Sequence, residues 1–229
     1  MHNSWDYQRL SEACKQEGCI LCRLTWQQAR RYLQTWKDEM FTDVDVREEL
    51  QRSQGFCHTH TWQLAQMGAS LPLAQAYRDI LSDAAELLAS EQGAETRRPR
   101  WFESRRTSTN RAPCPACRHK NQTLIRLVSV LREALPDPTF YPLFMASHGL
   151  CLPHFQLTCN LQPLNKPEAW LPQLRQAQLA CLKRVDEQLT ELIRKHDYRF
   201  KDETHGDEML SWQRAAGLVA GADEGQFSQ

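Results

Sequence analysis

Two kinds of residue pair recur in this chain of 229 residues, and their side chains are those that bind soft metal ions. A Cys-x-x-Cys pair is followed by a Cys-x-x-His pair, and the same order then occurs a second time. The gap between the two pairs is 34 residues in the first occurrence and 33 in the second. The first occurrence consists of Cys19, Cys22, Cys57 and His60, and the second of Cys114, Cys117, Cys151 and His154.

Chance does not account for this recurrence. With nine cysteines and eight histidines, random placement gives roughly 0.35 Cys-x-x-Cys pairs and roughly 0.31 Cys-x-x-His pairs in a chain of this length. Two of each kind, in the same order and at nearly the same separation, indicate an internal repeat.

Three thiolates and one imidazole are the ligands of a closed tetrahedral metal site, so the sequence predicts two such sites. We expect the four ligands of each repeat to close around one zinc ion, giving two zinc ions in all. The same ligands could instead hold two iron–sulfur clusters, which is the alternative cofactor. A covalently attached haem is disfavoured, because Arg23 and Arg118 follow the second cysteines where that motif has histidine. Either arginine could offset the net charge of −1 on a zinc site with three thiolates.

The spacer between the pairs is longer than the roughly 12–20 residues of small zinc modules, and we expect a helix to fill it. A Cys-x-x-His pair at a helix start lets both side chains reach one point, since residues three apart share a helix face. Gly55 and Gly149 stand two residues before Cys57 and Cys151, where glycine frees the backbone to bring the pair round.

Apolar spacings of three and four predict helices throughout the chain, and no alternating strand pattern occurs. The fold class predicted is therefore all-α, with two pseudo-symmetric halves that each hold one Cys₃His site. Any sheet would be a short β-hairpin at a metal knuckle. Expected helices follow Cys22, Asp43, Cys57, Pro72, Cys117, Pro153 and Pro172, with a further amphipathic segment at residues 208–221.

The repeat divides the chain into four parts. Residues 1–92 form the first half, 93–113 a basic linker, 114–196 the second half and 197–229 a charged C-terminal arm. We expect the arm to pack back on the helices. Three further cysteines, Cys14, Cys159 and Cys181, have no equivalent in the other half and are interpreted as structural thiols.

Composition and motifs argue against several classes of function. The 28 basic and 28 acidic residues balance, which argues against a general nucleic-acid binder, although the arginine-rich linker keeps that alternative open. No membrane-spanning run and no secretory signal are evident, and nine cysteines without a signal predict a reducing, cytoplasmic location. No catalytic motif is present, and four ligands at each site leave no open position for catalysis. We therefore expect a non-enzymatic metal-binding adaptor or regulator with a protein partner. The oligomeric state is not indicated.

The chain also resembles an uncharacterised bacterial family of unknown function with tandem metal-binding halves. The resemblance lies in Cys-x-x-Cys followed by Gly-[Phe/Leu]-Cys-x-x-His, in residues 195–200, and in Ser211-Trp212 with the alanine-rich stretch after it. It covers most of the chain. Because the family has no settled activity, the resemblance implies no catalytic residues.

Overall fold

The computed structural model describes residues 5–90, 112–161, 170–200 and 202–222. Across these residues the chain is helical and contains no strand, which confirms the all-α prediction. The hairpin considered for the metal knuckles is absent there, because both Cys-x-x-Cys segments begin helices. The α-helices are α1 (Trp5–Cys14), α2 (Ile20–Thr35), α3 (Val44–Arg52), α4 (His58–Gln66), α5 (Ser70–Ser90), α7 (Pro115–Ala134), α8 (Tyr141–Ala146), α9 (Leu152–Asn160), α10 (Trp170–Lys195) and α11 (Ser211–Ala220).

The chain divides into two compact units, which we describe separately. The first comprises Met1–Gln27 and Thr123–Gln229, and the second comprises Gln28–Gln122. Helices α2 and α7 each contribute residues to both units. These units are groups of contacting residues, whereas the division at 1–92, 93–113, 114–196 and 197–229 follows the repeat in the sequence and stays a prediction. Most of the linker, residues 91–111, lies outside the described residues.

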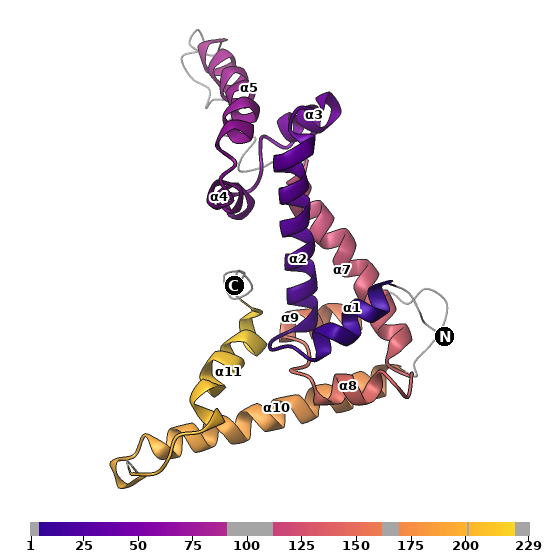
Figure 1. Cartoon of the computed structure of the whole chain (residues 1–229), viewed down its shortest axis with the longest axis vertical. Coiled ribbons are helices and arrows are strands. Elements are labelled where there is room, and N and C mark those ends of the chain that lie inside the picture. Colours follow the sequence, from indigo (N-terminus) through magenta and orange to yellow (C-terminus); the bar gives the residue numbers. More distant parts are fainter. Residues whose placement is uncertain (1–4, 91–111, 162–169, 201, 223–229) are drawn as a thin grey trace. The chain divides into compact units, whose positions relative to one another are not determined.

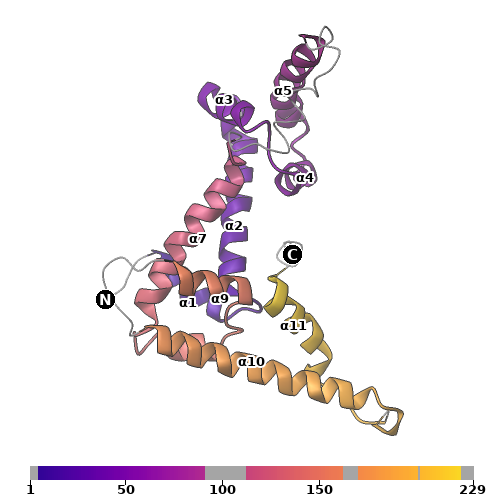
Figure 2. The ribbon, with the colours of Figure 1, turned by 180° about the vertical axis from the view of Figure 1, so that it is seen from behind.

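In the first unit, the long helix α10 carries α8 and α11, and α1 packs against α8 (Figure 1). Helix α11 also contacts α9, and Figure 2 shows these two helices from behind. Apolar faces at helical spacing fill the core, where Leu10, Ile20, Leu127, Phe140 and Leu174 are fully buried. Helix α1 itself was not predicted from the sequence.

In the second unit, α3 and α4 both pack against α5. Asp43 caps α3 by accepting a hydrogen bond from the Val46 amide at 3.1 Å, as the sequence predicted for that helix start. Helix α2 continues into a π-helical turn, Trp36–Met40, which places the fully buried Trp36 edge-on to Phe56 with ring centroids 5.0 Å apart. This contact orders the segment that leads to Cys57.

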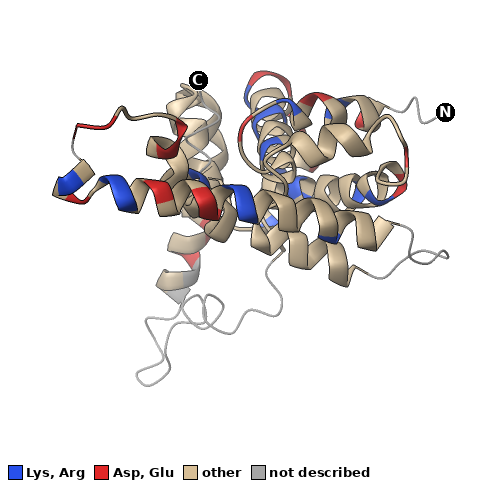
Figure 3. Cartoon of the chain, turned by 90° about the horizontal axis from the view of Figure 1, so that it is seen from below, with Lys and Arg blue, Asp and Glu red and all other residues tan. Residues whose placement is uncertain are grey.

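The C-terminal arm folds back along α10, as expected. Short 3-10 helices, Tyr198–Phe200 and Asp207–Leu210, lead into α11. Lys195 and Glu208 form an ion pair at 2.8 Å, and both side chains are only 10% exposed. The end of α10 and the segment after it carry both acidic and basic residues (Figure 3), and ion pairs such as Arg194 with Glu191 and Lys195 with Glu208 form there.

None of the helices in the described parts of the chain is long and apolar enough to span a lipid bilayer.

Candidate metal sites

The predicted ligands form two groups, and each group lies within one unit. Within each group, one Sγ or ring nitrogen per residue lies within 4.8 Å of every other. The first group, in the first unit, is Cys19, Cys22, Cys151 and His154; the second group, in the second unit, is Cys57, His60, Cys114 and Cys117.

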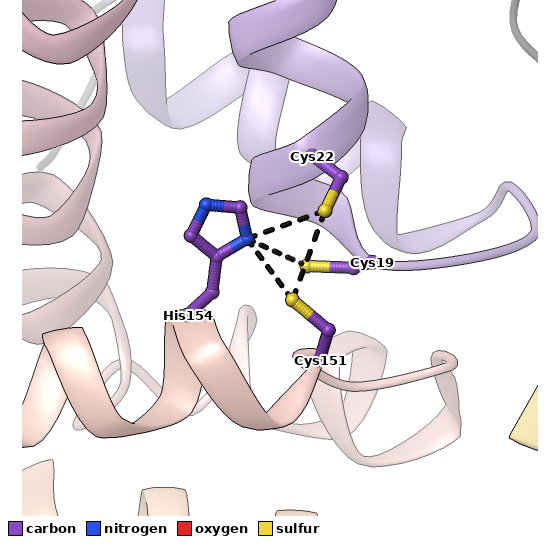
Figure 4. Close-up of side chains that lie close together, drawn as sticks. All are labelled: Cys19, Cys22, Cys151 and His154. Atoms are coloured by element: carbon purple, nitrogen blue, oxygen red, sulfur yellow. Dashed lines mark hydrogen bonds between the residues drawn. The ribbon is translucent and has the colours of Figure 1, made fainter. Parts of the chain in front are cut away.

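The first group is built by two helix starts that face each other (Figure 4). Cys19 precedes α2 and Cys22 lies in its first turn, whereas Cys151 is the N-cap of α9 and His154 lies in the first turn of that helix. The three sulfur atoms surround Nδ1 of His154 at 3.5 Å from Cys19, 3.3 Å from Cys22 and 3.2 Å from Cys151. The sulfurs of Cys22 and Cys151 are 3.7 Å apart.

The second group repeats this construction at the starts of α4 and α7. Nδ1 of His60 lies 3.1 Å from the sulfur of Cys57, 3.5 Å from that of Cys114 and 3.4 Å from that of Cys117. The sulfurs of Cys57 and Cys117 are again 3.7 Å apart. The two groups therefore have nearly the same geometry.

These separations match the edges of a tetrahedron around a single ion. With Zn–S of about 2.3 Å and Zn–N of about 2.0–2.1 Å, tetrahedral angles place two sulfurs about 3.8 Å apart and a sulfur and a nitrogen about 3.5 Å apart. A disulfide would need about 2.05 Å between sulfurs, and no described cysteine is disulfide-bonded. The donors present therefore fit one tetrahedral ion in each group.

The prediction that each repeat closes its own site is wrong. Each group instead combines the Cys-x-x-Cys pair of one half with the Cys-x-x-His pair of the other. Helix α2 has 16 residues and carries the chain about 24 Å from its own first turn, whereas the nine residues of α3 return only about 14 Å. In the second half the 20 residues of α7 span about 30 Å, and the helix that follows, α8, has only six residues. To close a site within one half, the chain would have to return over the whole length of α2 or α7, and the grouping of the ligands shows that it does not.

The glycines predicted to turn the chain at the second pair do so. Gly55 has φ of +90° and Gly149 has φ of +66°, both in the region that residues with a side chain rarely adopt. Each is followed by one buried apolar residue and then by the N-cap cysteine, Cys57 or Cys151. The repeat therefore uses the same backbone turn to present both Cys-x-x-His pairs.

A buried amide, Gln178, holds the turn before Cys151. Its Nε2 donates to the carbonyl oxygen of Leu150 at 2.8 Å, and its Oε1 accepts from the amide of Leu150 at 3.0 Å. Leu150 is itself fully buried, so these bonds satisfy backbone groups that water does not reach. In the sequence, Gln178 is an isolated glutamine on an otherwise apolar helix face, a pattern that indicates a buried polar contact. This contact was not predicted.

Tyr77 on α5 supports the equivalent turn in the second unit. Its ring lies against the position that a Cβ of Gly55 would occupy, at 3.4 Å, and its hydroxyl is 2.7 Å from that of Thr61. The Thr61 hydroxyl in turn donates to the carbonyl oxygen of Phe56. The two turns thus have the same backbone conformation but different side-chain supports.

Gly221, directly after α11, lies against the sulfurs of the first group. A Cβ added to Gly221 would lie 3.6 Å from the sulfur of Cys22 and 3.8 Å from that of Cys151. Gly221 has φ of +89° and ψ of 160°, a conformation open essentially to glycine alone. The sequence predicted that a helix ends at Gly221 but not that the glycine meets a metal site.

Burial opposes three unpaired thiolates in such a small volume. It raises the pKa of Cys19 well above its usual range, and burial with neighbouring thiols raises the pKa of Cys117 to about 12. Hydrogen bonds with Cys151 and Cys19 lower the pKa of Cys22. Burial acts to lower the pKa of His154, but hydrogen bonds with Cys151 and Cys22 outweigh it and raise that pKa to about 9. A bound cation would supply the positive charge that deprotonated donors need.

The surroundings of the two groups differ at the arginines that follow the Cys-x-x-Cys pairs. Arg118 pairs with Glu49, whereas Arg23 donates to the carbonyl oxygen of Glu17 at 2.6 Å. Neither contact is with a ligand sulfur. The remaining cysteines, Cys14, Cys159 and Cys181, belong to neither group.

Comparison with known proteins places the chain in a family. A family model described as a family of unknown function (DUF6062) matches residues 7–226. The searches of curated proteins and of solved structures gave no match. The bacterial origin expected from the sequence stays a prediction. Because the matched residues span nearly the whole chain, this protein belongs to the family of unknown function DUF6062.

Proposed function

We propose that each ligand group binds one zinc ion and that the protein acts without catalysis, as an adaptor or regulator through contacts with a protein partner. The observation that carries the proposal is the pair of Cys₃His groups with tetrahedral donor separations. Sulfur and imidazole donors suit zinc, and in a reducing compartment they stay available as ligands.

Donor separation also favours a single ion over an iron–sulfur cluster. In a cluster the ligands are distributed over different irons, so the donors lie farther apart than they do around one metal. All donor atoms of each group here lie within 4.8 Å of one another. This supports zinc over the alternative, two clusters that transfer electrons or sense oxidants.

The position of the ligands supports a structural role for the ions. Each ion would join the N-termini of two helices that are distant in the sequence, where the partial positive charge of the helix dipole favours thiolates. Four protein ligands complete a tetrahedral zinc shell and leave no position for a substrate or a reactive water. The geometry therefore favours scaffolding over catalysis.

A protein partner fits the charge of the chain better than nucleic acid does. The 28 basic residues are balanced by 28 acidic ones, and the arginine-rich linker falls mostly outside the described residues. Fluorescence anisotropy with labelled duplex DNA and single-stranded RNA should show no binding at physiological salt. Affinity that falls steeply as salt increases would instead favour a nucleic-acid partner.

Elemental analysis of untagged protein, purified without oxygen and without chelator, tests the metal directly. We expect about two equivalents of zinc and no visible absorption. Replacement by Co²⁺ should give the intense visible bands of a tetrahedral site with thiolate ligands, equally at both sites. Iron with acid-labile sulfide and a brown colour would contradict zinc and favour clusters.

A further inference from the structure

A cavity of about 490 Å³ lies in the first unit, beside the first ligand group but outside it. Its walls come from the turn before Cys19, from the start of α2, from α10 and from α11. Cys19 itself is on the wall but is only 3% exposed, so the ligand group does not open into the cavity. The volume is in the range of pockets that bind small molecules.

Several basic side chains line the cavity. Arg23, Arg214 and His148 line it, and a neighbouring cavity of about 180 Å³ shares His148 and Arg214 and adds Arg184. Burial, followed by the charges of Arg214, Arg184 and Arg23, lowers the pKa of His148. The only acidic residue on the wall of the larger cavity, among the described residues, is Glu17.

Arg214 makes its hydrogen bonds to the protein through one nitrogen of its guanidinium group. Both hydrogen bonds found for it in the described part of the chain come from Nη1, to Gln188 at 3.0 Å and to the carbonyl oxygen of Asp207 at 3.2 Å. The Nε and Nη2 edge can bind a carboxylate or phosphate through two parallel hydrogen bonds. Its nearest acid, Glu17, is 3.9 Å from Nη2 and 76% exposed, so solvent screens that pair.

Apolar side chains line the same cavity. They are Leu210, Trp212, Leu218 and Val185, and Trp212 is 57% exposed despite its size. An exposed indole beside a basic pocket offers a flat apolar surface to a ligand that one or two guanidinium groups hold at its other end. Arg118 in the second unit occupies the position in the repeat that Arg23 occupies in the first. Arg118 forms an ion pair with Glu49.

We propose that this cavity binds a small organic oxyanion, a phosphate or carboxylate attached to an apolar group. The oxyanion lies at the Nε and Nη2 edge of Arg214 and near Arg23, and the apolar group lies against Trp212 and Leu218. The wall shared with Cys19 makes the site sensitive to the fold around the first metal, but the contacts with the ligand are independent of the metal's identity.

Titration of the metal-loaded protein with phenyl phosphate and with phenylacetate, followed by calorimetry and by amide and indole NMR shifts, tests the proposal. Benzyl alcohol has the same apolar body without the charge and should not bind. We expect at least one of the two anions to bind, to shift the Trp212 indole signal, and to bind more weakly as salt increases. The relative affinity of phenyl phosphate and phenylacetate identifies the oxyanion.

Matched variants test the charged contact and the apolar contact separately. Arg214→Gln removes a charge-assisted pair and should weaken binding about tenfold or more, whereas Arg126→Gln, which removes an ion pair with Asp6 elsewhere in the same unit, should not change it. Trp212→Ala should weaken phenyl phosphate while leaving inorganic phosphate unchanged. Zinc content measured on each variant shows whether the metal site, rather than the cavity, has failed.

Three outcomes would overturn the proposal. Absence of binding by either anion at millimolar concentration would do so, with both metals present. Equal affinity for benzyl alcohol would also overturn it. So would an affinity that is unchanged in both Arg214→Gln and Arg23→Gln.

Discussion

Paired substitutions of ligands distinguish the observed grouping from a grouping within each repeat. In the structure Cys19 and Cys151 belong to one group, and Cys57 belongs to the other. The double variant Cys19→Ser/Cys151→Ser should therefore disable one site and leave the other intact. The double variant Cys19→Ser/Cys57→Ser should damage both sites. Ligands closed within each repeat would reverse these two results.

The expected magnitude comes from the four-ligand shell. Structural zinc sites bind with about 10–16 kcal/mol at neutral pH, which is about 2.5–4 kcal/mol for each of four ligands. One lost thiolate should thus weaken a site by roughly 10² to 10³, and two lost from the same site by the square of that factor. A single substitution can therefore retain zinc at high protein concentration, so counting metal after purification is not sufficient.

Release of zinc to a competing chelator of graded strength supplies the assay. Cys19→Ser/Cys151→Ser should keep about one equivalent at chelator strengths that leave the wild-type protein loaded. Cys19→Ser/Cys57→Ser should release both equivalents together at an intermediate strength. Cys159→Ser is the matched control, because Cys159 is partly exposed and lies in neither group. The exchanged grouping is refuted if the first variant releases both ions and the second retains one.

Four other outcomes are expected. Gln178→Ala leaves the buried amide and carbonyl of Leu150 without their partner, and should lower the free energy of unfolding by about 2 kcal/mol or more in chemical denaturation. Gly221→Ala forces a side chain into a conformation that costs on the order of 1–3 kcal/mol, so zinc release from the first site should accelerate while the second site is unchanged. Acidification should release zinc, because the ligands must lose protons to bind it and the pKa of Cys117 is raised to about 12. The zinc affinity therefore rises with pH and is lost as the pH falls. A pH titration with a zinc indicator measures this release. Cleavage at a protease site inserted in residues 93–113 should leave the two fragments together on gel filtration, because each ligand group has members on both sides of the cut; separation of the zinc-loaded fragments would contradict this.

The identity of the donors was available from the sequence, because cysteine and histidine pairs recur far more often than chance allows. Helix starts were also predictable where a cap or a glycine marks them, as at Asp43 and before Cys57 and Cys151. Helix α1 was missed, although Leu10, Ala13 and Cys14 are spaced three and four residues apart and are buried on one face.

Motif spacing alone could not predict which Cys-x-x-Cys pair lies in one group with which Cys-x-x-His pair. Spacers of 34 and 33 residues are equally consistent with a chain that folds back and with one that continues away. Helix length multiplied by rise per residue gives only the distance over which the chain must return to close a site within one half. The residues after α2 and after α7 are numerous enough to return that far, so the sequence leaves both groupings open. The support from Gln178 and the approach of Gly221 depend on tertiary contacts between segments far apart in the chain.

Exchange of ligands between the repeats makes each half of the chain dependent on the other. Neither repeat contains a complete site, since its Cys-x-x-Cys pair and its Cys-x-x-His pair belong to different groups. The apolar core of the first unit is divided in the same way, with Leu10 and Ile20 before the linker and Leu127 and Phe140 after it. An ion bound to each group would bring together the same distant segments as core formation does, so each would favour the other. The residues that the structure describes form no sheet that could pair remote segments, and two ions bound at helix starts would provide this long-range connection with few residues.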